Sequence, residues 1–231
     1  PDPTVDRKSG FLVPTIKNSP NSSNYLSLPY FKVISENRDL TFSPRFYTED
    51  KFLFQTEFRQ VNSKSSHISD FSFFNEKNEN TKNHLFYEYS KNLSYLKFDE
   101  SEINLKFQKV SNDTYLKANK LKSKLINSYN VLESYLDFSL YSEDLQIETE
   151  MTVYESLDKN NNDRYEFILP KVNIAKNIEN KTNLNGNFKF NSNNYIKNYQ
   201  TNVLEKININ DLTFNSNPKI SSSGFYNNYD F

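Results

Sequence analysis

The sequence predicts an all-β fold, an antiparallel up-and-down meander of the kind that forms a transmembrane β-barrel. Three observations predict it. From about Gly10 onward, runs of residues alternate between apolar and polar side chains, which is typical of strands with one buried face. Polar breaks of unequal length separate the runs. Several runs also reach the roughly 9–11 residues of a tilted membrane strand, whereas soluble strands have about 5–6.

The alternation is clearest in "LTFSPRF", where Leu40, Phe42 and Phe46 share one face and Arg45 lies on the other. The long runs are 40–48, 51–61, 132–141 and 145–155. The aromatic residues expected on a lipid-facing side are Phe42, Phe46, Phe52, Phe54, Phe58 and Phe107. The polar residues expected to line a wet lumen are Arg45, Gln55, Glu57, Arg59, Lys106, Gln108, Glu148 and Glu150. A soluble sandwich also alternates but would bury its aromatics against a second sheet, so periodicity alone leaves both folds open.

The breaks between the runs predict turns and loops. They lie at 35–39, 48–51, 75–83, 142–144 and 158–164. This mixture of short and long connections is typical of a barrel with tight turns at one rim and loops at the other. With only three Gly, Asn and Asp are expected at most left-handed turn positions. The best helix candidate is 113–126, with Asp113 or Thr114 as its cap.

The composition excludes several classes of protein. Only 35% of the residues are hydrophobic and no window approaches the roughly 18 apolar residues of a membrane helix, which excludes a helical membrane protein. An aromatic content of 16% argues against a disordered chain. The net charge of -1 gives no global field for nucleic acid, so no nucleic-acid partner is expected. The absence of Cys excludes disulfides, zinc-thiolate sites and thiol catalysis.

No catalytic residue, metal site or cofactor is predicted. The sequence carries no nucleophile-elbow, zinc-protease, phosphate-loop or dinucleotide-binding motif. The two histidines, His67 and His84, are 17 residues apart, and we expect both at the surface or in the lumen. The acidic pairs at 99–100 and 143–144 fall in breaks, where solvated carboxylates are the ordinary case.

Four segments of the chain carry a resemblance to a known family. They are "RKSGFLVP" (7–14), a Pro-Tyr-Phe run that ends in "TFSPR" (29–45), "EFR" (57–59) and "SNDTY" (111–115), and they occur in that order. Together they resemble the LptD family of lipopolysaccharide (LPS) assembly proteins, the outer-membrane component of LPS transport. The match extends from residue 1 to about residue 177, with "DRYEFILPKVNI" (163–174) as a less specific part. The Asn-rich remainder carries no signature.

The resemblance implies both an architecture and a function. In this family a periplasmic β-jelly roll precedes a very large barrel. Residues 1–9 would then be a hinge from a missing jelly roll, and residues 10–231 the N-terminal portion of the barrel. The implied function is an LPS translocon segment in the cell outer membrane of a Gram-negative bacterium, which passes LPS to the outer leaflet and is not an enzyme. The implied partners are LPS, outer-membrane lipids, an LptE-like lipoprotein plug and a periplasmic LptA-like bridge protein.

Two prolines and two cations are the candidate site residues. In the family, prolines at the start of the first two barrel strands weaken pairing with the last strand and create a lateral gate, and Pro14 and Pro29 match these positions. Each proline deletes one ladder donor, although prolines in sheets more often simply lie at an edge or a bulge. Arg7 and Lys8 precede the first strand and are possible contacts for LPS headgroup phosphates. A solvated hinge is the alternative for this pair.

Two other functions stay open at this stage. One is a soluble or surface-exposed β-sandwich that binds glycans through its Tyr- and Asn-rich faces. The other is a barrel enzyme, such as an outer-membrane protease or lipase, whose activity would depend on His67 or His84. Detergent extraction separates the membrane translocon from the soluble module.

Overall fold

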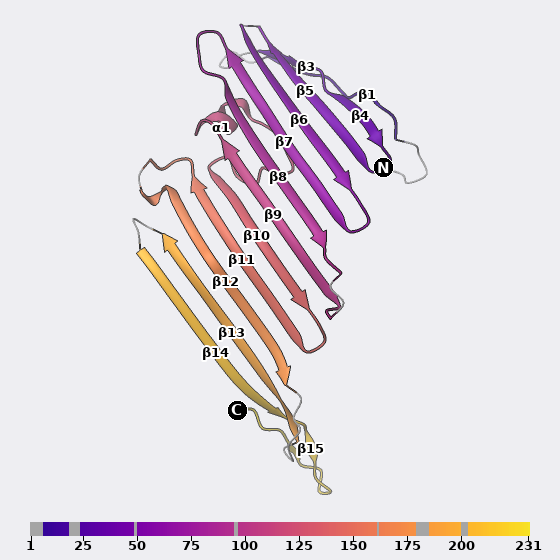
Figure 1. The fold of residues 1–231 in the computed structure, drawn as a ribbon, viewed down its shortest axis with the longest axis vertical. Coiled ribbons are helices and arrows are strands. Elements are labelled where there is room, and N and C mark those ends of the chain that lie inside the picture. The colour runs from indigo at the N-terminus through magenta and orange to yellow at the C-terminus, as the bar shows by residue number, and fades with distance from the viewer. Residues whose placement is uncertain are drawn as a thin grey trace. The chain divides into compact units, whose positions relative to one another are not determined.

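The computed structural model is almost entirely β (Figure 1), and it describes residues 7–18, 24–48, 50–94, 97–160, 162–178, 185–199 and 203–231. Most of the expected hinge, residues 1–6, therefore lies outside the described residues. None of the helices in the described ranges is long and apolar enough to cross a membrane.

The bounds of the elements are as follows. The first strands are β1 (Gly10–Phe11), β2 (Thr15–Lys17), β3 (Tyr25–Ser27), β4 (Tyr30–Ser35), β5 (Arg38–Tyr47), β6 (Lys51–Val61), β7 (Ser65–Glu76) and β8 (Lys82–Asn92). They are followed by β9 (Glu100–Val110), α1 (Tyr115–Asn119), β10 (Val131–Tyr141), β11 (Leu145–Ser156), the 3-10 turn η1 (Asn162–Arg164), β12 (Tyr165–Ile178), β13 (Gly186–Tyr199), β14 (Val203–Ser216), β15 (Lys219–Ile220) and β16 (Tyr226–Asn227).

The predicted fold class is confirmed. From β4 to β14 the hydrogen-bonded order of the strands follows the order of the chain, which is an antiparallel up-and-down meander. The long runs expected at 40–48, 51–61, 132–141 and 145–155 correspond to β5, β6, β10 and β11 within two residues at each end. The expected breaks at 48–51, 75–83, 142–144 and 158–164 each fall between or at the ends of strands.

The chain divides into two compact parts. The first part is Pro1–Lys91, Leu105–Ser134 and Tyr154–Asn160, and the second is Asn92–Asn104, Tyr135–Val153 and Asn161–Phe231. Strands β9, β10 and β11 contribute residues to both, and each part is described by itself.

In the first part, the register of β5, β6 and β7 separates aromatic from polar side chains. Pro44 lies opposite Phe54, which lies opposite Phe73, and this row belongs to the aromatic face. The next row, Ser43, Gln55 and Ser72, belongs to the polar face. Since side chains alternate along a strand, this register keeps each kind of side chain on its own side of the sheet.

The aromatic face remains largely open. Phe46, Phe71 and Phe107 keep 48%, 38% and 43% of their surface exposed. A β-sandwich would cover this face with a second sheet, because burial of aromatic surface is what holds two sheets together. In the described ranges, the other sheet consists only of the short strands β15 and β16. The glycan-binding sandwich is therefore not favoured.

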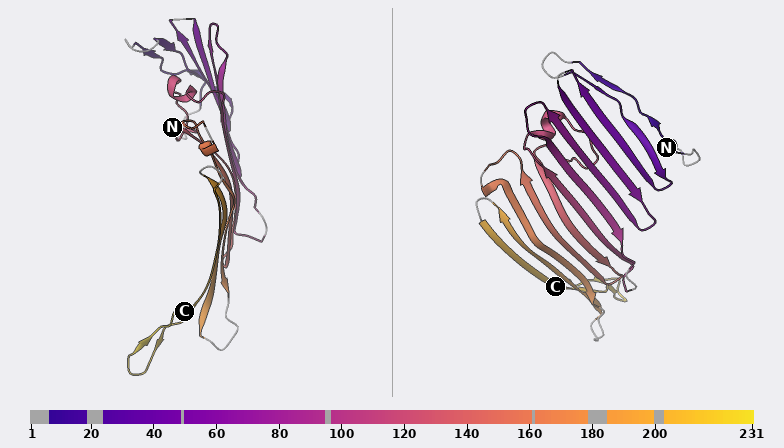
Figure 2. Two further views of the ribbon diagram at one scale, coloured as in Figure 1. Left: turned by 90° about the vertical axis from the view of Figure 1, so that its left-hand side faces the viewer. Right: turned by 45° about the horizontal axis from the view of Figure 1, so that its top comes forward.

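The small core of the first part lies on the opposite, polar side of the sheet. Figure 2 shows α1 on one face of the strands, and the segment around it packs there. Leu53 and Phe86 of the sheet meet Leu116 and Leu121 of this segment, and all four are completely buried. The helix is shorter than the expected 113–126, since α1 ends at Asn119 and the next residue, Lys120, adopts a left-handed conformation.

The cap of α1 also differs from a simple N-cap. Thr114 occupies the N-cap position, as one of the two expected residues, but its side chain makes no capping hydrogen bond to the helix. Its hydroxyl and its backbone N–H instead donate to Asn112 Oδ1, at 2.8 and 3.1 Å. The residues after Lys120 continue as irregular structure, because contacts with the sheet replace the hydrogen bonds of further helical turns.

In the second part, β12, β13 and β14 form long antiparallel ladders, and β13 pairs with β14 along fourteen residues. The Asn-rich sequence supplies side-chain hydrogen bonds along this pair, such as Ser192 Oγ to Asn210 Oδ1 at 2.7 Å. Gly186 begins β13 where Phe214 approaches closely, and a Cβ there would lie 2.5 Å from the ring and from the carbonyl oxygen of Asn215. Only glycine fits this close approach.

Candidate functional site

The first two strands of the sheet share fewer residue pairs than the β5–β6, β6–β7 and β7–β8 ladders that follow them. The first strand consists of β1 and β2 and the second of β3 and β4, and we call the pairing between them the seam. β1 pairs with β4 over two residues and β2 with β3 over three. By comparison, β6 and β7 pair without interruption over eleven residues. The seam therefore has fewer than half the residue pairs of a regular ladder in the same part of the chain.

A bulge interrupts the seam. Phe11 lies opposite Tyr30, and the next paired residues are Thr15 and Ser27. Three residues (12–14) of the first strand therefore face only two (28–29) of the second, so the register shifts by one residue. Pro14 belongs to the longer side, where an unpaired residue is expected and a missing N–H costs little.

Pro29 removes a hydrogen bond from the seam itself. The N–H of Leu12 donates to the carbonyl oxygen of Pro29 at 2.8 Å. Directly opposed residues of this kind normally exchange two bonds in an antiparallel ladder. The second bond would run from residue 29 to the carbonyl of Leu12, but proline has no N–H. The pair is thus reduced to one bond.

A third proline has the same effect one strand further along. Leu28 N–H donates to the carbonyl of Pro44 at 3.3 Å, and Pro44 cannot return a bond. β3 and β4 pair with β5 in the same register. Leu28 and Pro29 are the two residues between β3 and β4, where the second strand is interrupted. The sequence alone predicts no role for Pro44, because only strand register shows that it lies beside the interruption. The second strand is therefore weakened on both sides at the same level.

One end of the seam is anchored by charge. Asp39 at the start of β5 is nearly buried and accepts from two arginines: Arg7, which precedes the first strand, and Arg59, whose Nε lies 2.7 Å from Asp39 Oδ1. Arg7 also donates to the carbonyl oxygen of Glu36 and stacks over Phe31, 5.6 Å from the ring centre. Hydrogen bonds between charged groups are among the stronger ones. Arg7 therefore fixes the beginning of the first strand.

Lys8 is exposed, as Arg7 is, but of the two only Arg7 forms an ion pair with a residue that the structure describes. Next to it, Ser9 Oγ accepts from the backbone N–H of Val33 at 2.9 Å, which adds a second fixed point at this end of the seam. The structure thus brings Arg7 and Pro29 to neighbouring places on the same strand pair, with Pro14 in the bulge above them. The expected role of both cations in binding headgroup phosphates stays a prediction.

Residues 111–130, which we call the inner segment, cover polar side chains of the sheet. Because the segment has little regular structure, its carbonyl groups need partners. Side chains of the sheet supply them: Arg45 donates to Asn119 O at 2.5 Å, Gln55 to Lys122 O at 3.0 Å, and Gln108 to Leu125 O at 2.5 Å. From the sequence we expect these three side chains to line a wet lumen, but in the structure they are buried as donors to the inner segment.

Tyr115 anchors the inner segment in a buried polar cluster. Its hydroxyl lies 2.6 Å from Ser72 Oγ, which lies 2.6 Å from His84 Nδ1. His84 Nε2 is 3.3 Å from Asp70 Oδ1 but makes no hydrogen bond to it, and Asp70 accepts from the amide of Gln55. Burial raises the pKa of Tyr115 to about 12, because the phenolate would lose its solvation. The tyrosine is therefore held as a neutral hydrogen-bonding group.

The cluster contains Ser72, His84 and Asp70, the residue types of a hydrolytic triad, but it has no access to a substrate. All three side chains are completely buried, and Tyr115 occupies the position next to the serine hydroxyl. His84 is therefore neither at the surface nor in an open lumen as expected, because Tyr115 covers it. His67 is half-buried, and its Nδ1 lies 2.8 Å from the hydroxyl of Tyr87.

Comparison with known proteins gives one consistent result. The chain is 27% identical over 190 residues to the LPS-assembly protein LptD of Pseudoalteromonas atlantica, which is 81% of this chain and 24% of that protein. It is 29% identical over 115 residues to LptD of Mannheimia succiniciproducens, which is 47% of this chain and 14% of that protein. The predicted resemblance to LptD is confirmed. No family model matches the chain.

A third LptD, from Bordetella pertussis, is 33% identical over 82 residues, which is 36% of this chain and 10% of that protein. The chain thus spans about a quarter or less of the length of these relatives. The structure shows what two residues of the LptD-like segment 111–115 do. Ser111 forms hydrogen bonds with Asn83 at the start of β8, and Tyr115 inserts into the buried cluster.

Proposed function

We propose that this LptD-like chain is the gate-side section of an outer-membrane barrel that passes LPS to the outer leaflet, with no covalent chemistry. The observation that carries the proposal is the seam, a first strand held by five residue pairs at the edge of a sheet in which β6 and β7 pair over eleven residues. The names of the relatives, LPS-assembly proteins, indicate the substrate.

In this proposal the first strand moves and the rest of the sheet stays in place. The resemblance implies a lateral gate between the first strand and the last, with Pro14 and Pro29 as its prolines. Both lie in the seam between the first and second strands, so in this proposal they leave the first strand free to move at that gate. We add Pro44, which weakens the second strand from its other side. Arg7 holds the first strand at one end, so that movement is confined to the bulge and the pairs beyond it. A loosely held strand can separate at a low free-energy cost, because each ladder bond contributes about 1 kcal/mol.

The two faces of the first part suit a membrane wall. The exposed aromatic face would contact lipid chains, and the polar face, partly covered by the inner segment, would face the lumen. In this arrangement residues 1–9 are a hinge to a periplasmic jelly roll, and residues 10–231 are barrel. The expected partners are LPS, outer-membrane lipids, an LptE-like lipoprotein plug and a periplasmic LptA-like bridge protein. Lys8, with Arg7, is the proposed contact for headgroup phosphates at the entrance.

The experiment that tests the proposal is replacement of the gate prolines in living cells. P14V/P29V should lower the amount of LPS at the cell surface, because residue 29 gains a ladder donor and the seam opens less often. P218V is the matched control, since Pro218 lies between β14 and β15 and not in a ladder. Equal surface LPS in P14V/P29V and P218V cells, at equal protein levels in the outer membrane, would contradict the proposal.

A further inference from the structure

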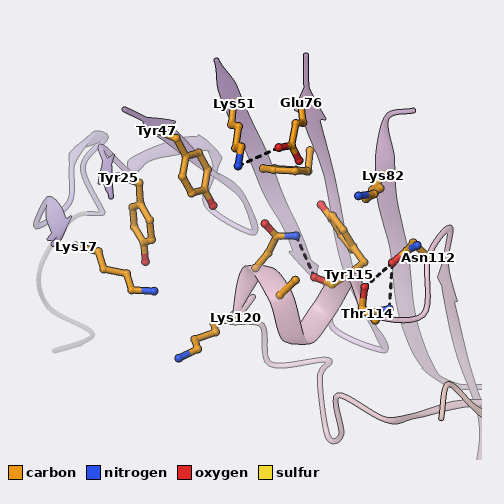
Figure 3. A pocket seen from close by; sticks show the side chains of 13 residues that line it. Lys17, Tyr25, Tyr47, Lys51, Glu76, Lys82, Asn112, Thr114, Tyr115 and Lys120 are labelled. Carbon is orange, nitrogen blue, oxygen red and sulfur yellow. Dashed lines mark hydrogen bonds and ion pairs between the residues drawn. The ribbon is translucent and has the colours of Figure 1, made fainter. Parts of the chain in front are cut away.

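A cationic cavity lies at the far end of the seam. It has a volume of about 340 Å³ and is bounded by strand residues and by the inner segment (Figure 3). Four lysines line it, Lys17, Lys51, Lys82 and Lys120, together with one carboxylate, Glu76. Four positive charges and one negative charge leave an excess of three positive charges around one small space, although the whole chain carries a net charge of -1.

Two of the lysines are neutralised by acidic neighbours. Lys51 Nζ lies 2.9 Å from Glu76, and Lys82 Nζ lies 2.6 Å from Glu79, a residue outside the lining. The hydrogen bond from Lys82 lowers the pKa of Glu79, so this carboxylate stays ionised. Lys17 and Lys120 form no ion pair with any residue that the structure describes. These two lysines are therefore the ones left to bind an anion.

Hydrogen-bond donors stand beside the two lysines. Lys17 Nζ lies 5.8 Å from the ring of Tyr25, its register partner across the seam. Figure 3 shows Lys17 and Tyr25 on one side of the cavity and Lys120 on the side of α1. The hydroxyl of Tyr47 points into the same space. Ammonium groups and phenol hydroxyls around one cavity match a small anion that carries several acceptor oxygens.

We propose that this cavity binds a phosphate or diphosphate group. Phosphate fits because it has the size, the multiple charge and the acceptors that the lining offers, whereas a single carboxylate would leave one of the two unpaired lysines without a partner. The site deepens the proposed function: if the gate passes LPS, a phosphate on its headgroup is the ligand. Because Lys17 and Tyr25 form the last pair of β2 and β3, a bound phosphate would bridge the seam to the inner segment.

The test is binding of inorganic pyrophosphate to the purified protein in detergent, measured by isothermal titration calorimetry. We expect saturable binding that is at least tenfold weaker in K17Q/K120Q and largely retained in K17R/K120R. The matched control is K32Q/K64Q, which removes two exposed lysines that do not line the cavity. Absence of saturable binding, or an equal loss in K32Q/K64Q, would overturn the site. Circular dichroism establishes that each variant keeps its strand content.

A second arm identifies the source of the phosphate. Solubilised LPS should displace pyrophosphate from the wild-type protein, and enzymatically dephosphorylated LPS should not. Displacement by neither would show that the site takes free phosphate, which refutes a headgroup ligand. The outcomes also separate this site from the gate: loss of binding in K17Q/K120Q with normal export in P14V/P29V supports the site and contradicts the gate. Normal binding in K17Q/K120Q with impaired export in P14V/P29V contradicts the phosphate site and supports the gate.

Discussion

Restoring the missing donors of the second strand should close the seam. In P29V/P44V, residue 29 gains an N–H that faces the carbonyl of Leu12, and residue 44 gains one that faces the carbonyl of Leu28. Two recovered bonds contribute about 2 kcal/mol, and more where water is scarce. Without the two prolines the opened chain has more conformational entropy, and this reduces the stabilisation from the two bonds by about 1 kcal/mol. The net gain of about 1 kcal/mol lowers the opening equilibrium about fivefold.

Hydrogen–deuterium exchange in detergent measures this opening directly. The amide of Leu12 should exchange about fivefold more slowly in P29V/P44V than in the wild-type protein, since exchange of a bonded amide requires opening. P218V changes the chain's freedom without adding a ladder donor and should leave this rate unchanged. Unchanged or faster exchange of Leu12 in P29V/P44V would refute the reasoning, because the prolines would then not limit the strength of the seam.

Three further predictions address the anchor, the inner segment and the second part. Asp39→Asn should speed exchange of the Val33 amide about tenfold, since Arg7 and Arg59 lose a charged partner worth about 1–2 kcal/mol; an unchanged rate would exclude the anchor. Folding stabilises the neutral form of Tyr115, so its contribution is complete below pH 10 and is lost as the pH rises from 10 to about 12. Because the chain has 16 Tyr, the signal of Tyr115 is the difference in tyrosinate absorbance between wild-type protein and Tyr115→Phe. This difference should rise near pH 12, and a rise near pH 10 would contradict the burial of Tyr115. Gly186→Ala should destabilise the protein by about 1–3 kcal/mol in thermal unfolding, whereas Gly10→Ala, with no atom within 4 Å of its added Cβ, should have little effect, and equal effects would contradict the close approach of Phe214.

Much of the sheet follows from local sequence. Strict alternation in runs such as 51–61 predicts strands because one-sided burial requires a period of two, and the structure keeps this register through β5, β6 and β7. The candidate Pro29 was also predictable, because a proline deletes a donor wherever it lies in a ladder. The roles of Pro14 and Pro44 were not, since a bulge and a directly opposite residue depend on the register between strands.

The inner segment could not be predicted for a different reason. Its helical pattern over 113–126 is a local signal, but contacts with Gln55 and Gln108, which are distant in sequence, decide where the helix ends. The burial of His84 has the same origin, because Tyr115 reaches it only through the return of the chain over the sheet. Long-range contacts of this kind override local propensity.

A disulfide lock across the seam tests the central claim most directly. The chain has no Cys, so I16C/L26C introduces a single pair at directly opposed residues of β2 and β3. The control pair is F54C/F73C, at opposed residues of the uninterrupted ladder between β6 and β7. We expect that oxidised I16C/L26C stops LPS export to the cell surface and that reduction restores it, while F54C/F73C exports normally in both states. Normal export from fully oxidised I16C/L26C would contradict a moving first strand.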